Sequence, residues 1–362
     1  LISLCGSLNA VYPASRVIVA SRPYAYEGWK LPGFESVTIT AFVDRHRIAL
    51  ADRLYRAAGL DADAAAQKAK ALNTQLTPID PELKDRPLFV TLMATIFLKN
   101  GAAGLPTRRG ALYRQSILLL LDRWTAGKPD EPSLVTLLGD KTPHDLYARL
   151  AALAYDVHTR YGEQNGTPEI DEGILYTHLK PLGRKVSAEL IPYLSENAGV
   201  LVSPGQNDSR DVFHFAHRTF QEYLAAEEIV RLCVSADTFD LIRRLIMEKP
   251  QLWRVPCTLA GDVLADTDRR ADLWNLLDDL LEDDVTVLAA DDPRWWAVWL
   301  AGVVTREQGI HDLSSLRKSE KTTRESVVAW LTANIETAGA LPPPERASCG
   351  LTLGLLGDPR PG

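Results

Sequence analysis

Two side chains that could bind an anionic ligand, Arg22 and His217, stand where one predicted element gives way to the next. Arg22 ends a short apolar run, and a guanidinium there offers a positive charge and a fork of donors to phosphoryl or carboxylate oxygens. His217 separates an alternating run from a helical one, and an imidazole can donate a hydrogen bond and gain a charge beside an anion. Taken singly, a surface arginine paired with a carboxylate and a histidine that caps a helix explain these residues more simply.

No other group of residues suggests catalysis or a metal site. His214 precedes His217 by three residues, but no further Cys or carboxylate stands at ligand spacing. The four cysteines are far apart and form no Cys-x-x-Cys pair, so neither a disulfide framework nor a zinc knuckle is indicated, and a reducing cytoplasm is the expected compartment. No Ser/His/Asp order or pair of carboxylates stands out. We therefore expect no catalytic residue and no metal ligand in this chain.

Composition excludes two classes of partner. Hydrophobic residues make up 46% and charged residues 24% of the 362 residues, the balance of a soluble globular protein with several modules. The net charge of -7 gives no basic footprint for nucleic acid. The longest apolar run, 295–304, is about half of the ~20 residues that a membrane-spanning helix requires. We expect neither nucleic acid nor a membrane as a partner.

The first 42 residues carry the pattern of buried parallel strands. Runs 16–22 and 36–42 are short and apolar, which is typical of strands covered on both faces. Residues 23–34, rich in Gly, Pro and aromatics, are predicted to form a loop at the carboxyl end of the first strand, where open α/β sheets bind ligands. Residues 1–10 are apolar but lack a basic start and an initiator Met, so we expect an internal fragment rather than a signal peptide.

From residue 43 onward the pattern is mostly helical. Thr142-Pro143 and Thr167-Pro168 each supply an N-cap and a proline for the first position of a helix. A helix over 186–197 precedes two alternating strands, 199–203 and 211–216, which are joined by turn-forming residues. Helices, a hairpin and a further helix, in this order, indicate a winged-helix module with one helix appended.

Residues 234–340 are predicted to form further amphipathic helices. This stretch holds six of the eight tryptophans of the chain. Stacked helical pairs need large buried side chains, so we interpret the tryptophans as core anchors of a solenoid-like domain rather than as a ligand platform.

Three segments, in order along the chain, resemble NACHT ATPases, the nucleotide-driven signalling switches of the NOD-like receptor and bacterial defence type. His-Arg-Thr-Phe-Gln-Glu-Tyr-Leu-Ala-Ala, residues 217–226, is similar to the winged-helix signature of that family. Residues 17–26 resemble its sensor strand. Residues 86–94, followed by 105–113, resemble its first helical domain. Together these segments cover most of residues 10–233.

The resemblance implies nucleotide-binding roles for three residues. Arg22 would face the terminal phosphate, Pro87 would lie against the adenine, and His217 would approach the β-phosphate of ADP. Arg86 stands where the family usually has Asn. The implied cofactor is ATP or ADP, with Mg²⁺ in the intact protein. The chain contains no Gly-Lys-Ser/Thr loop, so we expect neither tight nucleotide binding nor ATP hydrolysis by this fragment of a P-loop NTPase alone.

These expectations combine into a mainly α fold that begins with the C-terminal edge of a parallel α/β NTPase sheet. Residues 345–362 are similar to the end of a HEAT-like repeat, of the kind that leads into a formylglycine-generating-enzyme-like domain. Five modules are predicted. They are the end of the NACHT nucleotide-binding domain (1–42), helical domain 1 (43–130), a winged helix (131–233), a HEAT-like helical superstructure (234–340) and a repeat end with linker (341–362).

The function that the resemblance implies is the regulatory part of an ATP/ADP-dependent signalling switch in bacterial, including antiviral, defence or in signal transduction. Such a switch self-associates when activated. One alternative is a winged-helix transcription regulator with a helical sensing domain. Against it, the candidate recognition helix 186–197 carries two glutamates and no Lys or Arg. The other alternative, a helical scaffold protein, leaves the positions of Arg22 and His217 unexplained.

Overall fold

The protein divides into two compact units, Leu1–Val43 and Asp44–Gly362. The computed structural model describes the chain apart from residues 1, 13, 20–32, 80, 107, 123–133, 162–167, 208–209, 267–268, 283, 309–315, 338 and 361–362. Every buried core residue that it describes belongs to the second unit. No helix in the described part of the chain is long and apolar enough to cross a membrane.

The first unit contains helix α1 (Ile2–Val11) and extended chain. The predicted strands are not confirmed, because residues 16–19 and 36–42 form no ladder, and Arg22 lies outside the described residues. The side chains of Ile18, Val37 and Ile39 are exposed by 82%, 82% and 91%. A parallel strand exists only through hydrogen bonds to neighbouring strands, and the described part of this unit holds no such neighbour. An apolar run alone does not make a strand.

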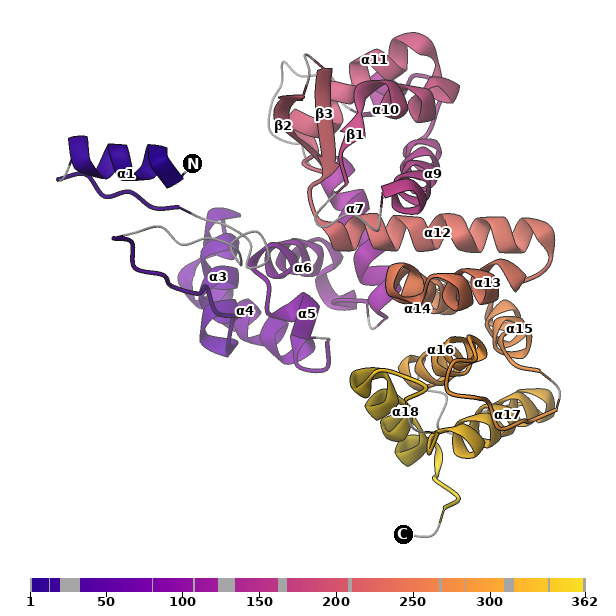
Figure 1. Ribbon diagram of the computed structural model, residues 1–362. Coiled ribbons are helices and arrows are strands. Elements are labelled where there is room, and N and C mark those ends of the chain that lie inside the picture. The colour runs from indigo at the N-terminus through magenta and orange to yellow at the C-terminus, as the bar shows by residue number, and fades with distance from the viewer. Residues whose placement is uncertain are drawn as a thin grey trace. The chain divides into compact units, whose positions relative to one another are not determined.

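The second unit begins with a group of helices around α6 (Figure 1). α3 is tied to α6 by Tyr55, whose hydroxyl donates to the Ala94 carbonyl over 3.3 Å. α4 starts at Asp61, whose carboxylate accepts a hydrogen bond from the Ala64 amide, an N-cap that stabilises the first turn. The helices of this group are α3 (Asp44–Ala57), α4 (Ala62–Leu76), α5 (Pro81–Lys84), α6 (Pro87–Asn100) and α7 (Arg109–Asp122).

A helical and three-stranded module follows. Its sheet has the order β1-β3-β2 and is antiparallel, with Ile170 opposite Phe213 and Leu201 opposite Phe215. The predicted hairpin is confirmed as β2 and β3, while β1 was not predicted. The elements are α8 (Leu134–Leu138), α9 (Pro143–Tyr161), β1 (Ile170–Asp171), α10 (Glu172–Leu179), α11 (Arg184–Pro192), β2 (Leu201–Asn207), β3 (Arg210–Phe215) and α12 (Arg218–Ala236).

The two predicted helix starts in this module had different outcomes. α9 begins at Pro143 as predicted, and Thr142 and Asp145 bond reciprocally as a capping box, with the Thr142 amide 2.8 Å from the Asp145 carboxylate. The start at Pro168 is wrong. Residues 170–171 pair with β3 instead, and α10 begins after Asp171, whose carboxylate accepts from the Gly173 amide over 2.7 Å. Strand pairing overrides the local capping signal at Thr167-Pro168.

The C-terminal helices pack around α16, which contacts every other helix of this group. α16 is apolar on almost all sides, and Trp295, Ala297, Leu300 and Val304 are each buried to at least 98%. A helix that is apolar all round belongs in a protein interior, which explains the longest apolar run of the sequence. The group consists of α13 (Asp240–Glu248), α14 (Pro250–Asp266), α15 (Arg270–Leu280), α16 (Arg294–Glu307), α17 (Lys318–Asn334) and α18 (Pro343–Leu356).

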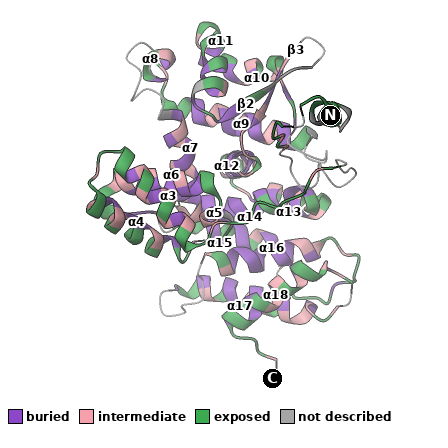
Figure 2. Ribbon diagram, turned by 90° about the vertical axis from the view of Figure 1, so that its left-hand side faces the viewer, coloured by how far each residue is buried: buried purple, intermediate pink, exposed green. Residues whose placement is uncertain are grey.

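The tryptophans of this group lie in the core, as predicted. Trp253, Trp274, Trp295, Trp299 and Trp330 are all buried, and Trp296 packs against the core from its edge. Trp330 also donates its indole N–H to the Glu282 carbonyl over 3.0 Å. Figure 2 shows buried residues concentrated where α12, α14 and α16 run through the unit.

Candidate functional site

His217 lies at the start of α12, directly after β3. It is the N-cap residue, with an extended backbone (φ −138°, ψ 129°), and its side chain makes no capping hydrogen bond to the helix. The ring is half-buried, and its Nδ1 lies 3.1 Å from the Thr219 hydroxyl. The interpretation of His217 as a side-chain helix cap therefore does not describe the geometry.

An aromatic junction, formed by Phe89, Tyr113, His217, Phe220 and Tyr223, joins α6, α7 and α12. The Phe89 ring stands edge-on to the rings of His217 and Phe220, with centroids 5.4 Å away in both cases. Phe89 also meets Tyr113 edge-on at 5.7 Å, and Tyr113 stacks on Tyr223 at 5.2 Å. Edge-to-face and offset rings at these spacings attract one another beyond simple burial. The junction therefore fixes the start of α12 against α6.

Pro87 stands two residues before Phe89, at the first position of α6, with Arg86 as the N-cap. The Pro87 side chain is exposed, so its ring does not fill the core, and it stands where a proline commonly starts a helix. Through Phe89, the structure brings the helix start that carries Pro87 to the junction that holds His217. Arg22, the third predicted site residue, lies outside the described residues.

The two helix starts share an electrostatic property. Neither α6 nor α12 has an acidic residue in its first turn. The first amide groups of a helix point outward with a partial positive charge, and acidic side chains normally occupy that place. Both starts are therefore electrostatically suited to an anionic ligand.

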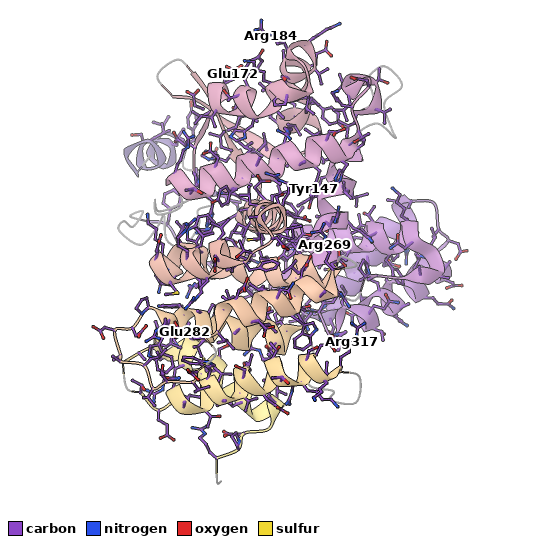
Figure 3. All side chains as sticks on the ribbon, turned by 90° about the vertical axis from the view of Figure 1, so that its right-hand side faces the viewer. Tyr147, Glu172, Arg184, Arg269, Glu282 and Arg317 are labelled. Atoms are coloured by element: carbon purple, nitrogen blue, oxygen red, sulfur yellow. The ribbon has the colours of Figure 1, made fainter. Side chains whose placement is uncertain are left out.

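A polar network beneath the junction holds α12 on α9 and α7. The Glu227 carboxylate accepts hydrogen bonds from the hydroxyls of Tyr147 (2.9 Å) and Tyr223 (2.8 Å), and Figure 3 shows Tyr147 beside α12. Arg114 lies over the Tyr147 ring, 5.7 Å from its centroid. Burial is the main cause that holds the pKa of both tyrosines well above the usual range, and the nearby Glu227 charge adds to it. Both tyrosines therefore stay protonated and act as donors.

Arg109, the first residue of α7, is clamped between α14 and α16. Its Nε lies 2.6 Å from Asp262 Oδ2 and its Nη2 lies 2.6 Å from Glu307 Oε2. Gln308 donates a hydrogen bond to the second carboxylate oxygen of Asp262 over 2.7 Å. The Asp262 side chain is only 6% exposed. Burial by itself would lower the pKa of Arg109, but Asp262 and Glu307 raise it above its usual value. The guanidinium is thus a permanent charge at this helix contact.

Gly110 lets α7 approach α14 closely. A Cβ at this position would lie 2.9 Å from the Asp262 carbonyl oxygen, closer than real Cβ contacts. Arg109 and Gly110 thus fix the start of α7 on the C-terminal part of α14. Sequence reasoning missed both contacts, because Arg109 and Asp262 are remote in the chain and no local pattern pairs them.

The described residues offer no metal centre and no reactive thiol. No three or more His, Cys, Asp or Glu side chains among them could hold a metal ion together. Burial raises the pKa of Cys233 to about 11 and that of Cys349 to about 12, and it also raises the pKa of Cys257. Thiols in such surroundings are poor nucleophiles.

One comparison with known protein families concerns the part of the chain from α7 to α12. Residues 109–229 match the sequence model of the winged helix-turn-helix domain C-terminal to NACHT. This part of the chain is thus similar to a winged-helix domain that is associated with NACHT. It contains His217 and Glu227, and Pro87 lies before it. A search of curated proteins gave no match.

The match starts with α7, whereas the sequence prediction placed the start of the winged helix at residue 131. The module boundaries proposed from the sequence remain predictions. The candidate recognition helix also differs from the predicted range of 186–197. α11 begins at Arg184 and includes Lys185, and both side chains are exposed, so the statement that this helix lacks basic residues is wrong. Figure 3 shows Arg184 at the outer end of the winged helix.

Proposed function

We propose that this chain is the regulatory region of a NACHT-type, ATP/ADP-dependent signalling switch in bacterial defence or signal transduction. The observation that carries the proposal is the match of residues 109–229 to the winged helix C-terminal to NACHT, with His217 at the start of its last helix. A switch of this type acts on nucleotide and assembles with further copies when activated.

His217 and Pro87 are the described residues that would hold the nucleotide. The His217 imidazole would donate to a phosphate oxygen at the positive end of α12, where no acidic side chain opposes the charge. The exposed Pro87 ring would lie flat against the base. Arg22 is proposed to contact the terminal phosphate through its guanidinium fork. When bound, the nucleotide supplies the negative charge of its phosphates. Exchange between ATP and ADP changes that charge and so favours one conformation of the switch over the other.

The aromatic junction supports this role because it connects the two nucleotide-contacting helix starts. A shift of His217 away from its ligand cannot leave Phe89 in place, since their rings are in contact at 5.4 Å. Close-packed rings adopt a few discrete arrangements rather than a continuum. Exchange of the nucleotide at His217 would thus be transmitted to α6 and to the rest of the second unit.

The test uses the natural gene product that contains these 362 residues. His217→Ala should weaken ADP binding by roughly 1 to 3 kcal/mol, the range of a hydrogen bond to a charged group, and should promote spontaneous assembly. Calorimetry measures the affinity and light scattering measures the assembly. His214→Ala is the matched control, because His214 lies three residues away on β3 and its Nδ1 lies 3.0 Å from the carbonyl of Pro168, which precedes β1. If His217→Ala keeps wild-type ADP affinity and remains monomeric, the proposal fails.

One observation favours the second candidate function, a winged-helix transcription regulator. Arg184 and Lys185 are exposed at the start of α11, the end of a recognition helix that usually meets bases. However, Lys185 lies 3.9 Å from Glu189, and Asp and Glu outnumber Lys and Arg within residues 109–229. We therefore rank DNA binding below the nucleotide switch, and a direct measurement is given in the Discussion.

A further inference from the structure

The segment 284–289, between α15 and α16, is held at both ends by tryptophan side chains. Just before it, the Glu282 carbonyl accepts from the indole N–H of Trp330 over 3.0 Å. At its end, the Ala289 carbonyl accepts from the indole N–H of Trp295 over 3.1 Å. The structure describes every residue of the segment, and none of them is helical.

Asn334 of α17 takes the place of a neighbouring strand along one edge of this segment. Its side chain is fully buried, and its Nδ2 donates to the Thr286 carbonyl over 3.1 Å while its Oδ1 accepts from the Leu288 amide over 2.7 Å. In an extended chain, alternate residues direct their amide and carbonyl groups to the same edge. The carboxamide that bridges Thr286 and Leu288 therefore fixes an extended backbone, in which Val285 and Val287 direct their groups to the opposite edge.

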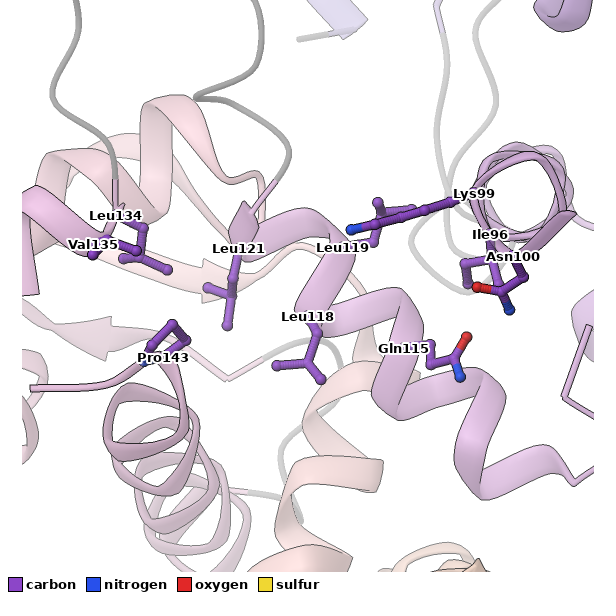
Figure 4. A pocket seen from close by; sticks show the side chains of 10 residues that line it. All are labelled: Ile96, Lys99, Asn100, Gln115, Leu118, Leu119, Leu121, Leu134, Val135 and Pro143. Atoms are coloured by element: carbon purple, nitrogen blue, oxygen red, sulfur yellow. The ribbon is translucent and has the colours of Figure 1, made fainter. Parts of the chain in front are cut away.

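The opposite edge is open. The backbone of neither Val285 nor Val287 makes a hydrogen bond to any residue that the structure describes. Their side chains, which share one face of an extended chain, are exposed by 42% and 74%. Unpaired backbone groups beside exposed apolar side chains are a template for another strand. This edge differs from the apolar space shown in Figure 4, which adjoins residues 123–133, outside the described part of the chain.

The surroundings of this edge are acidic. Residues 278–292 contain seven Asp and Glu residues and no Lys or Arg. Asp284 and Asp291 are exposed and form no ion pair with a described residue. Arg294, at the start of α16, is already paired with Asp292 over 2.7 Å. A strand that carries basic residues beside its apolar ones therefore complements this edge in charge.

We propose that residues 284–289 form a docking edge for an extended basic segment of a partner protein, which adds to the edge as a strand. Backbone hydrogen bonds to Val285 and Val287 supply the affinity, as in strand addition to a sheet edge. β-branched side chains of the partner pack on the two valines, and its Lys or Arg residues lie beside Asp284 and Asp291. The edge contains none of the nucleotide residues and does not depend on the proposed function.

The test is isothermal titration calorimetry of the 362-residue protein with the heptapeptide Lys-Lys-Val-Thr-Val-Lys-Lys. It should bind with a stoichiometry of one, and the acidic counterpart Glu-Glu-Val-Thr-Val-Glu-Glu should bind about tenfold more weakly or not at all. Two N-methylated forms test the backbone pairing, one methylated on both valines and the other on the threonine and the lysine after the second valine. Because alternate amides face opposite edges, one form should lose about tenfold in affinity and the other should retain it.

Substitutions in the segment test the location. Val287→Pro removes the outward N–H but breaks no hydrogen bond among the described residues, and it should weaken the basic heptapeptide about tenfold. Val287→Thr keeps the N–H and the β-branched shape, so it is the matched control and should bind as the wild type does. Asp284→Asn should weaken binding about threefold, the size of an exposed ion pair, whereas Glu325→Gln, at an exposed carboxylate of α17, should not.

The proposal is overturned if the basic heptapeptide gives no binding heat at millimolar concentration, if the two N-methylated forms bind alike, or if a folded Val287→Pro variant binds as the wild type does. The comparison of N-methylated forms needs no protein variant, so it decides the matter even if Val287→Pro fails to fold. A dimer in light scattering that Val287→Pro dissociates would assign the edge to a second copy of this chain and would overturn the proposal as well.

Discussion

The clamp at Arg109 gives a prediction whose size follows from the structure. Arg109→Ala removes a guanidinium that contacts Asp262 and Glu307 at 2.6 Å each. Loss of one partner from a fully buried ion pair costs about 3 to 5 kcal/mol, because a buried charge is left uncompensated. Here Asp262 keeps its hydrogen bond from Gln308, and the Glu307 side chain is 26% exposed, so water compensates part of the loss. We expect a loss of about 2 kcal/mol in the free energy of unfolding.

The assay is reversible urea denaturation combined with a double-mutant cycle of Arg109→Ala and Asp262→Ala. The coupling energy should be about 1.5 kcal/mol, and it should change little with salt because Asp262 is almost fully buried. Arg160→Ala is the matched control. Arg160 also lies 2.6 Å from a carboxylate, that of Asp156, but its side chain is 57% exposed, and such pairs contribute about 0 to 1 kcal/mol. Equal losses for Arg109→Ala and Arg160→Ala, or a coupling energy below about 0.5 kcal/mol, would refute the reasoning.

Three further predictions concern catalysis, DNA and pH. This chain alone should not hydrolyse ATP, since one arginine cannot position the attacking water; turnover above background that disappears on Arg22→Ala would contradict this. It should not bind duplex DNA at micromolar concentration, because the winged helix is acidic overall; salt-sensitive retardation of a duplex would show the opposite. Burial lowers the pKa of His158 to about 4, below the usual 6.5, so the unfolded chain takes up a proton first as the pH falls. The free energy of unfolding should therefore be about 3 kcal/mol higher above pH 6.5 than near pH 4, because acidification favours the unfolded chain, in which His158 is protonated. His158→Gln should flatten the unfolding free energy measured over this window, and an unchanged pH profile would count against the assignment.

The features that the sequence predicts correctly are those decided by local chemistry. The hairpin of β2 and β3 follows from alternation and turn residues, and the start of α9 follows from Thr142-Pro143. The place of His217 between strand and helix is also local. The burial of the tryptophans follows from their size and apolar surface.

The features that the sequence does not predict depend on distant residues or on backbone conformation. Phe89 and His217 meet only in the folded chain, and no local pattern pairs them. α11 starts two residues earlier than predicted because Gly183 takes a φ of 114°, which ends the preceding turn and lets the helix begin directly after it. The runs 16–22 and 36–42 have strand-like composition, but a ladder also needs partners, and composition does not supply them.

The central position of α16 has a consequence for how the C-terminal helices respond to damage. In a stack of repeats each unit touches only its neighbours, so terminal units can fray while the others persist. Here α13, α14, α15, α17 and α18 all rest on one helix. Removal of α18 would uncover Gly302, where the space for a Cβ is closed by Leu331 of α17 and Thr352 of α18. The loss of one outer helix therefore loosens the contacts of the others through their shared support. We expect these helices to unfold together in a single cooperative step, with no partially folded truncation product that protease can trim from the end.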